Sequence, residues 1–269
     1  GGGLAVVGAA FQGIFRNPLA DPHILGVSSG AAVGATIAII LSEAIGLSAH
    51  FLGLGTIGIF AFVGALLTVF IVYHVAKLGG EISTVSMLLT GTAISTFLSA
   101  IISLMMTFNQ KQIDKVYMWT LGSFSAANWD KVVFLALFTV IGSVILICYS
   151  QKLNIMMMGE EDAKSLGIDT DQLRRRIILV ASLLVAAAVS VSGVIGFVGL
   201  IVPHCVRLMC GADNRKVMPA SIFAGAIFLV ICDTIARTVA APTEIPVGVI
   251  TSFFGAPYFI WLVWKRKRK

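Results

Sequence analysis

Few residues in this sequence have the types and spacing that enzyme chemistry or metal binding requires. Asp233 and Arg237 stand four residues apart near the end of an apolar stretch, where they can pair on one face of a helix. No segment of the form G-x-x-x-x-G-K-[ST] occurs, so the chain does not bind ATP in the manner of a P-loop protein. The cysteines have no metal-site spacing and fall in or beside apolar runs, which favours reduced thiols in the core: Cys148, Cys205, Cys210 and Cys232. We therefore expect no catalytic residue, no metal site and no cofactor bound by this chain.

The composition indicates a protein whose solvent is lipid. Hydrophobic residues make up 58% of the 269 residues and charged residues 12%, whereas a soluble domain carries about 25% charged residues. The apolar runs are continuous over ~18–20 positions, while the strands of a membrane β-barrel alternate apolar and polar residues. These features predict an all-α, polytopic helical membrane protein of about nine spans. The expected spans are 1–14 (partial), 27–45, 57–76, 86–107, 131–149, 176–192, 196–209, 218–236 and 247–264.

The cations divide the connections between these spans into two sets. One set holds most of the lysines and arginines, including the basic tail 265–269, and the other holds four cations, Lys111, Lys115, Lys131 and Arg237. Because cytoplasmic loops carry the excess of Lys and Arg, we expect the segment 150–176 and the C-terminus inside and the segment 109–130 outside. The tail is interpreted as an anchor beside the last span and not as a nucleic-acid-binding patch.

Small residues recur at four-residue spacing in Gly26, Gly30 and Gly34. Such a ladder lets two helix backbones approach closely in lipid. The partner helix can belong to the same chain or to a second copy of it, and the sequence leaves both interpretations open.

Ionisable residues are almost absent from the middle of the predicted spans. A carrier driven by a proton or sodium gradient usually needs buried acids or unwound helices near the middle of the membrane. An ion-coupled secondary transporter is therefore the less favoured alternative, and the energy for transport is expected from another subunit.

Four polar segments interrupt the apolar pattern, and together they resemble one family. They are RNPLADPHILGVSSGA at 16–31, SGVIGFVGLIVPH at 192–204 followed by Arg207 and GxDxR at 211–215, DxxAR at 233–237, and EIPVG at 244–248 with GAPYF at 255–259. In this order and at these distances they resemble the permease subunits of type II ATP-binding-cassette (ABC) importers for siderophores, haem and cobalamin, the FecCD type. The resemblance covers essentially the whole chain and implies a single transmembrane permease domain over 1–269. The family has ten spans, and because the match begins within its second span, the first is expected to be missing here.

The resemblance implies a cytoplasmic gate at two places. In the family, an Asn-Pro-Leu turn after the second span forms part of the gate, and it matches Asn17, Pro18 and Leu19. The proline leaves backbone free to line a pathway, although an ordinary tight turn explains the same residues. The second gate element, a Ser-Thr pair, matches Ser83 and Thr84, which are also suited to cap the helix expected nearby.

The segment 150–176 resembles the family's coupling loop, which seats in a groove of the ATPase subunit. Its glycines, charges and apolar positions give the candidate coupling residues Gly159, Glu160, Ala163, Leu166 and Gly167. A short amphipathic helix ended by the glycine at 167 fits the local sequence. An ordinary solvated loop is the alternative.

On the expected outer side, Arg237 aligns with an arginine that meets acidic residues of the periplasmic binding protein in the family's cobalamin permease. Lys111 and Lys115 are further outer cations. The resemblance thus implies that an extracytoplasmic solute-binding protein docks at these residues, while the alternative role for Arg237 is an internal pair with Asp233.

The function implied by the resemblance is import of a metal chelate into the cytoplasm. The chain is expected to be the multi-pass subunit in a prokaryotic plasma (inner) membrane, and to form a homodimer that works with two ABC ATPase subunits. Those partners use ATP and Mg, so this chain is not itself an enzyme and binds no nucleic acid. An iron–siderophore complex is the commonest cargo of similar proteins, with haem and cobalamin next.

Overall fold

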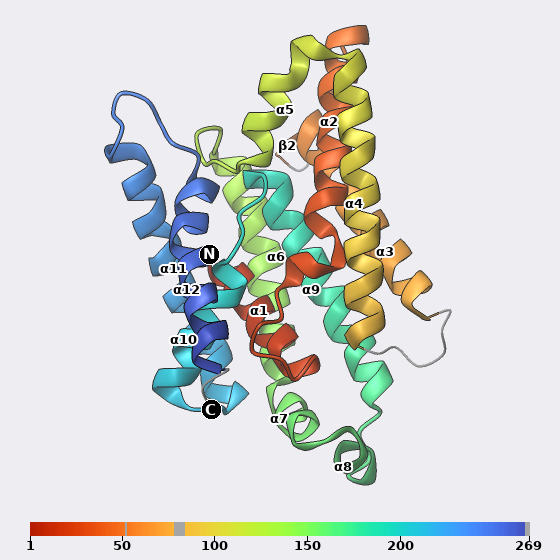
Figure 1. Cartoon of the computed structure of the whole chain (residues 1–269), viewed down its shortest axis with the longest axis vertical. Coiled ribbons are helices and arrows are strands. Elements are labelled where there is room, and N and C mark those ends of the chain that lie inside the picture. Colours follow the sequence, from red (N-terminus) through yellow and green to blue (C-terminus); the bar gives the residue numbers. More distant parts are fainter. Residues whose placement is uncertain (52, 78–83, 267–269) are drawn as a thin grey trace.

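The computed structural model describes residues 1–51, 53–77 and 84–266, and it is helical apart from one short hairpin (Figure 1). The strands β1 (His50–Phe51) and β2 (Leu54–Gly55) pair antiparallel, with His50 opposite Gly55. The expected all-α polytopic class is confirmed. The helices are α1 (Gly2–Ile14), η1 (Pro22–Leu25), α2 (Val27–Ile45), α3 (Thr56–Lys77), α4 (Thr84–Phe108), η2 (Gln110–Gln112), α5 (Ile113–Thr120), α6 (Trp129–Cys148), α7 (Ser150–Met158), α8 (Glu160–Ser165), α9 (Thr170–Ser192), α10 (Val198–Cys210), α11 (Asn214–Thr238) and α12 (Val247–Arg266).

Each of the nine predicted apolar segments corresponds to a helix. Within the described residues, six are long and apolar enough to cross a membrane, namely α2, α3, α4, α6, α9 and α11. Three are shorter: α1, α10 and the part of α12 from Val247 to Leu262. The 13 residues of α1 or α10 extend about 20 Å at 1.5 Å per residue, less than the hydrocarbon thickness of about 30 Å. The nine expected spans are therefore six full-length candidates and three shorter apolar helices.

Two long helices begin earlier than the apolar pattern predicts. The carboxylate of Asp169 accepts the N–H of Gln172 at 2.8 Å, so α9 begins at Thr170 and not at residue 176. The carboxylate of Asp213 caps α11 by accepting the N–H of Arg215, so α11 begins at Asn214, four residues before the predicted start. Both first turns are polar, so they do not appear in the hydrophobic pattern. An aspartate at the N-cap nevertheless favours a helix there.

The core of the molecule surrounds α1 and α9. Every residue from Gly2 to Ile14 is buried, and α9 is buried over most of its length. The helix α1 packs against α9, α10 and α11, while α9 also contacts α2, α3 and α6. By contrast, α4 and α6 are little buried, and many large apolar side chains lie on the outer surface. Apolar groups thus occupy the interior and the exterior, as expected for a protein dissolved in lipid.

The glycine ladder packs within the chain, where it lets α2 and α3 cross closely. A Cβ atom at Gly34 would lie 2.0 Å from the backbone oxygen of Phe60, and one at Gly30 would lie 2.5 Å from that of Gly64. Gly26 precedes α2 with a φ of 72°, in the left-handed region that favours glycine. The intrachain interpretation of the ladder is therefore confirmed.

The two ends of the bundle carry the two sets of connections predicted from charge. Figure 1 places α5 and the hairpin at one end, and α7 and α8 at the opposite end, towards which the end of α12 also lies. We call these the α5 end and the α8 end. The segments 109–130 and 150–176 thus lie at opposite ends of the molecule, as the Lys and Arg distribution predicts.

Candidate functional site

The Asn-Pro-Leu turn follows α1 directly and is half-buried. Asn17 Oδ1 accepts the N–H of Leu19 at 3.1 Å, and the N–H of Asn17 donates to the backbone oxygen of Gln12 at 3.2 Å. Pro18 lies between them, and Arg16 has a φ of 46°, in the left-handed region. The turn is therefore fixed both by its own side chain and by the last turn of α1.

The second expected gate element is only partly within the described residues. Thr84 is the first residue of α4, whereas Ser83 lies outside the described ranges. The expected capping role of this pair therefore stays a prediction.

His23 ties the segment after the turn to the connection between α9 and α10, a role that sequence reasoning missed. Asp21 accepts the N–H of His23 at 2.8 Å and so begins η1. Nδ1 of His23 hydrogen-bonds to the hydroxyl of Ser28, and Nε2 lies 3.1 Å from the backbone oxygen of Ile195. The Asp-Pro-His run was visible as a motif, but its distant partner was not.

The segment expected to couple the chain to an ATPase contains α7, α8 and the start of α9, with Gly159 between α7 and α8. Gly167 has a φ of 77°, and its N–H donates to the backbone oxygen of Lys164 at 3.0 Å. The N–H of Ile168 donates to the backbone oxygen of Ala163 at 3.0 Å, which completes a Schellman helix end. The predicted short helix ended by this glycine is confirmed, and its contact with a partner stays a prediction.

The residues named for coupling divide into buried and exposed ones. Glu160 lies 3.3 Å from Arg174 of α9, and Ala163 is fully buried within the chain. Leu166 is 66% exposed, and Gly167 beside it is exposed too. The expectation that Ala163 packs on a partner is therefore wrong, because its side chain supports α8 from within. Leu166 instead presents the apolar surface.

A partly buried polar network joins α7 to α1 at the α8 end. Arg207 of α10 donates to Oδ1 of Asn214 at 2.7 Å and to the backbone oxygen of Ala9 at 3.1 Å. The Nε of Arg207 also donates to Oε1 of Gln12 at 3.4 Å. The N–H of Asn214 donates to Oδ1 of Asn154 in α7 at 2.8 Å. This Arg207 network, made of Gln12, Asn154, Arg207 and Asn214, connects the coupling segment with the helix that leads into the Asn17 turn.

Asp213 caps α11 beside this network. Its carboxylate accepts the N–H of Arg215 at 3.0 Å and the side-chain amide of Asn154 at 2.6 Å, and the Arg215 guanidinium lies 2.9 Å from it. The hydrogen bonds from Arg215, and next the one from Asn154, hold the pKa of Asp213 below its usual value. The carboxylate is therefore charged at neutral pH, and its contribution to stability is lost only as the pH falls through that lowered pKa.

Arg237, named for docking, is held between two carboxylates. Its guanidinium lies 2.9 Å from Asp233 and 3.3 Å from Glu244, and its side chain is 40% exposed. The internal pair with Asp233 is therefore present. Ser125, from the connection between α5 and α6, donates its hydroxyl to Glu244. The end of α11 is thus tied to the α5 end, and this ionic cluster carries a net negative charge.

Lys111 and Lys115 lie on other elements of the α5 end. Lys115 of α5 pairs with Glu43 of α2 at 3.2 Å, with both side chains well exposed. Lys111 is exposed in η2 and lines a shallow pocket together with Glu43 and Thr107. The two lysines therefore gather around α2 and the end of α4, whereas Arg237 belongs to α11.

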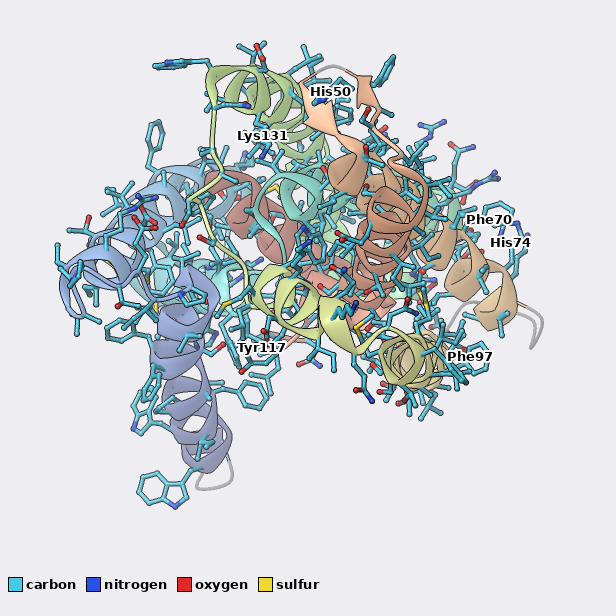
Figure 2. All side chains as sticks on the ribbon, turned by 90° about the horizontal axis from the view of Figure 1, so that it is seen from above. His50, Phe70, His74, Phe97, Tyr117 and Lys131 are labelled. Atoms are coloured by element: carbon cyan, nitrogen blue, oxygen red, sulfur yellow. The ribbon has the colours of Figure 1, made fainter. Side chains whose placement is uncertain are left out.

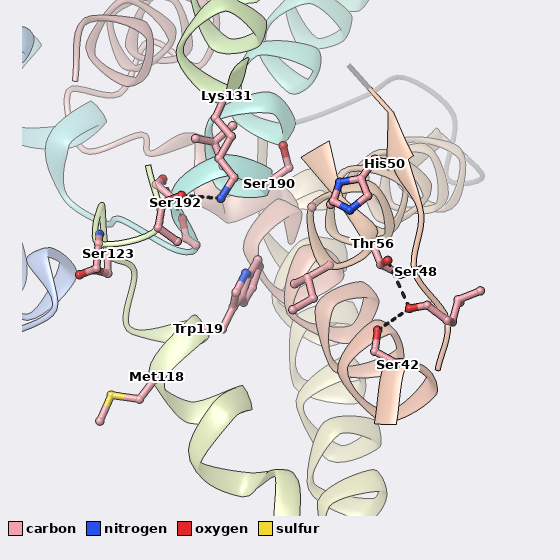
Figure 3. Close-up of a pocket in the computed structure, with 18 of the residues that line it drawn as sticks. Ser42, Ser48, His50, Thr56, Met118, Trp119, Ser123, Lys131, Ser190 and Ser192 are labelled. Atoms are coloured by element: carbon pink, nitrogen blue, oxygen red, sulfur yellow. Dashed lines mark hydrogen bonds between the residues drawn. The ribbon is translucent and has the colours of Figure 1, made fainter. Parts of the chain in front are cut away.

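A cavity of about 690 Å³ opens at the α5 end. Figure 3 shows Trp119, Lys131 and His50 around it. Lys131 Nζ donates to the backbone oxygen of Ala126 at 2.7 Å. The rest of the wall is rich in hydroxyl groups, from Ser42, Ser48, Thr56, Ser123, Ser125, Ser190 and Ser192. Apolar side chains such as Leu47, Ile57 and Val191 complete the wall, so the lining is mixed.

The helix α4 carries one exposed row of hydroxyl groups. Each donates to the backbone oxygen four residues earlier at 2.8–3.0 Å, which satisfies the donor and leaves oxygen lone pairs facing outwards. The outer face of α6 is different, because it presents aliphatic side chains such as Val133, Val140 and Val144. The face of α6 is suited to lipid and that of α4 to a polar environment. This α4 hydroxyl row consists of Thr92, Thr96, Ser99, Ser103 and Thr107.

The thiols do not form a site. Among the described residues, no group of three or more His, Cys, Asp or Glu side chains could hold a metal ion. Cys232 is buried as expected and Cys205 is half-buried, but Cys148 and Cys210 are exposed. The expectation of core thiols is therefore wrong for the last two, which lie on outward faces of apolar helices.

The described residues form a bundle of apolar helices, six of them long enough to cross a membrane, as in a multi-pass membrane protein. The FecCD transport family model matches residues 1–265. The chain is 44% identical over 269 residues to the cobalamin import system permease protein BtuC of Halobacterium salinarum, covering 99% of this chain and 70% of that relative. It is 38% identical to the Fe(3+)-citrate import system permease protein YfmD of Bacillus subtilis (98% and 77% covered) and 36% identical to the hemin transport system permease protein HmuU of Yersinia pestis (99% and 79% covered).

Two solved structures share the fold. A structure described as an inward-facing conformation of a metal-chelate type ABC transporter aligns with a TM-score of 0.86 at 34% identity, covering 98% of this chain and 83% of that one. PsaBC from Streptococcus pneumoniae aligns with a TM-score of 0.66 at 15% identity, covering 96% and 85%, which shows the fold alone.

The chain belongs to the FecCD transport family. It is a permease subunit of an ABC importer of the metal-chelate, cobalamin and haem type, and a multi-pass protein of the inner membrane. The alternative of an ion-coupled secondary transporter is not favoured.

Proposed function

We propose that two copies of this chain enclose a pathway for a metal chelate, and that separate ABC ATPase subunits drive transport at the α8 end. The α4 hydroxyl row is the observation that carries this proposal. It faces away from the chain on a helix that is otherwise apolar and little buried. A second copy placed against α4 would shield the row from lipid and give a solute path one polar wall from each subunit.

At the α8 end, the proposed contact with the ATPase is made by Leu166 and Gly167. Gly159, Glu160 and Ala163 hold α8 in place, as the ion pair to Arg174 and the burial of Ala163 support. ATP and Mg belong to that partner, and this chain transmits the movement to the cytoplasmic gate. The gate consists of Asn17, Pro18, Leu19, Ser83 and Thr84.

At the α5 end, a solute-binding protein is proposed to dock at Arg237, Lys111 and Lys115. These cations lie on two separate parts of that end, so the docking surface is broad. The hydroxyl-lined cavity around Trp119 and Lys131 opens at the same end. It is therefore well placed to receive polar groups of the cargo after release.

The proposed cargo is an iron–siderophore complex. A relative that imports Fe(3+)-citrate shares 38% of the residues of this chain. The outward lone pairs of the α4 hydroxyl row can accept hydrogen bonds from N–H and O–H groups on the outside of such a chelate. Cobalamin is the second candidate, favoured by the 44% identity to a cobalamin import permease over 99% of the chain.

Reactivity of single cysteines tests the pathway. In a cysteine-free background assembled with its ATPase, Ser99→Cys and Ser103→Cys should react with a charged, water-soluble thiol reagent, because thiolates react in water and not in lipid. Val140→Cys and Val144→Cys on α6 are the matched controls and should stay unreactive. If the cysteines at positions 99 and 103 are as unreactive as the α6 controls, the hydroxyl row lies in lipid and the proposal is wrong.

Stimulation of ATP hydrolysis tests the cargo. The permease and its ATPase are reconstituted in nanodiscs with the solute-binding protein, and the panel contains iron–siderophores, iron–citrate, haem, cobalamin and molybdate. The proposal expects the strongest stimulation by an iron–siderophore. Stimulation by cobalamin alone would select the second candidate, and no stimulation by any chelate would reject both.

A further inference from the structure

A groove of about 470 Å³ lies between α3 and α9, near the α8 end. Its walls are apolar and include Phe70 and Leu179, which are 60% and 56% exposed. Figure 2 shows Phe70 and His74 projecting from α3 at the edge of the molecule. The groove therefore faces the surroundings of the bundle and is separate from the α4 hydroxyl row.

Two cations stand at one end of this groove. Lys77 is the last residue of α3 and Arg175 lies in the second turn of α9, so both are near the α8 end of their helices. Both are exposed, and neither forms an ion pair with a carboxylate in the part of the chain that the structure describes. The neighbouring Arg174 differs, because it pairs with Glu160 and Asp171.

Contacts within α3 position the aromatic side chains of the apolar wall. The imidazole of His74 lies with its centroid 4.0 Å from that of Phe70, and its Nδ1 donates to the backbone oxygen of Phe70 at 2.8 Å. Tyr73 packs edge-on against the same imidazole. Three aromatic rings on the last turns of α3, those of Phe70, Tyr73 and His74, therefore pack together between the cations and the apolar wall.

We propose that this groove binds one anionic phospholipid. The phosphate lies between Lys77 and Arg175, and an acyl chain follows the wall past Phe70 and Leu179. Two exposed cations, which meet no carboxylate within the described ranges 1–51, 53–77 and 84–266, stand beside an exposed apolar channel and so match both halves of such a lipid. A soluble phosphate compound would use only the cations and would leave the apolar channel without an occupant. The inference depends on neither the cargo nor the proposed partners.

Native mass spectrometry tests the site. The full chain is extracted in a mild detergent and mixed with equal amounts of phosphatidylglycerol and phosphatidylcholine, and the retained lipids are counted. We expect preferential retention of phosphatidylglycerol, and we expect Lys77→Gln with Arg175→Gln to lower it about ten-fold. The charge-conserving pair Lys77→Arg with Arg175→Lys should retain the lipid as the unmodified chain does.

The matched control is Lys164→Gln with Lys216→Gln, which removes two exposed cations from the same end but outside the groove. Equal loss in this control, or equal retention of the two lipids by the unmodified chain, would overturn the proposal. Release of the lipid by millimolar glycerol phosphate would overturn it too, in favour of a soluble ligand. If the glutamine pair does not fold, Leu179→Trp narrows the apolar channel while leaving both cations, and unchanged retention in that variant would equally reject the site.

Discussion

Arg207 and Asn214 form a 2.7 Å hydrogen bond between the guanidinium on α10 and the fully buried side-chain oxygen at the start of α11. The same asparagine is bonded through its backbone to Asn154 in α7. One buried residue thus joins the coupling segment to the arginine that holds the last turns of α1.

Asn214→Ala should therefore destabilise the protein and also weaken coupling. Arg207 would lose a buried acceptor, which costs about 1–3 kcal/mol, and the midpoint of thermal unfolding in detergent should fall accordingly. In the assembled transporter, ATP hydrolysis should respond less to cargo. Asn109→Ala at the α5 end is the control, because that side-chain amide donates to the backbone oxygen of Met105 in the preceding helix. The control should change neither quantity. Normal stability and coupling in the Asn214 variant would contradict the network's role.

Leu166→Glu should release the ATPase while leaving the fold intact. Leu166 is exposed and contributes nothing to the core, so the unfolding midpoint should not move, whereas a charge at an apolar contact should weaken association at least about ten-fold. Co-purification with the ATPase measures this. Ile45→Glu replaces an equally exposed apolar residue at the other end of the molecule and should co-purify normally, and normal co-purification of both variants would remove Leu166 from the contact.

Arg237→Glu should weaken binding of the solute-binding protein and reduce the dependence of that binding on salt. Because Arg237 sits between Asp233 and Glu244, the variant also places three acids together and should unfold at a lower temperature. The swap Asp233→Arg with Arg237→Glu restores a pair, and with it stability, but moves the cation by one helical turn. Binding restored along with stability would mean that the arginine only neutralises its neighbours, whereas binding that stays weak supports docking.

Gly34→Ala should lower stability through the contact between α2 and α3. The added Cβ would lie 2.0 Å from the backbone oxygen of Phe60, so the helices must separate, at a cost of about 1–3 kcal/mol. Gly196→Ala is the matched control, because a Cβ there meets nothing within 4 Å. Comparison of the two unfolding midpoints checks the prediction, and equal midpoints would show that α2 and α3 are free to move apart.

The sequence predicted the nine apolar helices and the helix end at Gly167, but it missed the polar first turns of α9 and α11. Continuous apolar runs locate nine helices, and Gly167 marks a left-handed helix end that depends only on neighbouring residues. Long-range polar contacts could not be predicted from the sequence. The bond from His23 to Ile195 spans 172 residues, and the Arg207 network links four helices. The side on which Ala163 is buried also depends on where α8 packs. The local sequence pattern does not predict that packing.

The complete burial of α1 bears on how the chain is made. A ribosome delivers α1 to the membrane before α9, α10 and α11, the helices that enclose it. Until they arrive, the surface of α1 that α9, α10 and α11 will cover is not enclosed, and the side-chain amide of Gln12 lacks its Arg207 partner. A helix that is synthesised before α9, α10 and α11 is thus fully enclosed only after them. Biogenesis of this fold must end with late helices closing around an early one, so a truncation near the C-terminus would expose α1 to quality-control proteases.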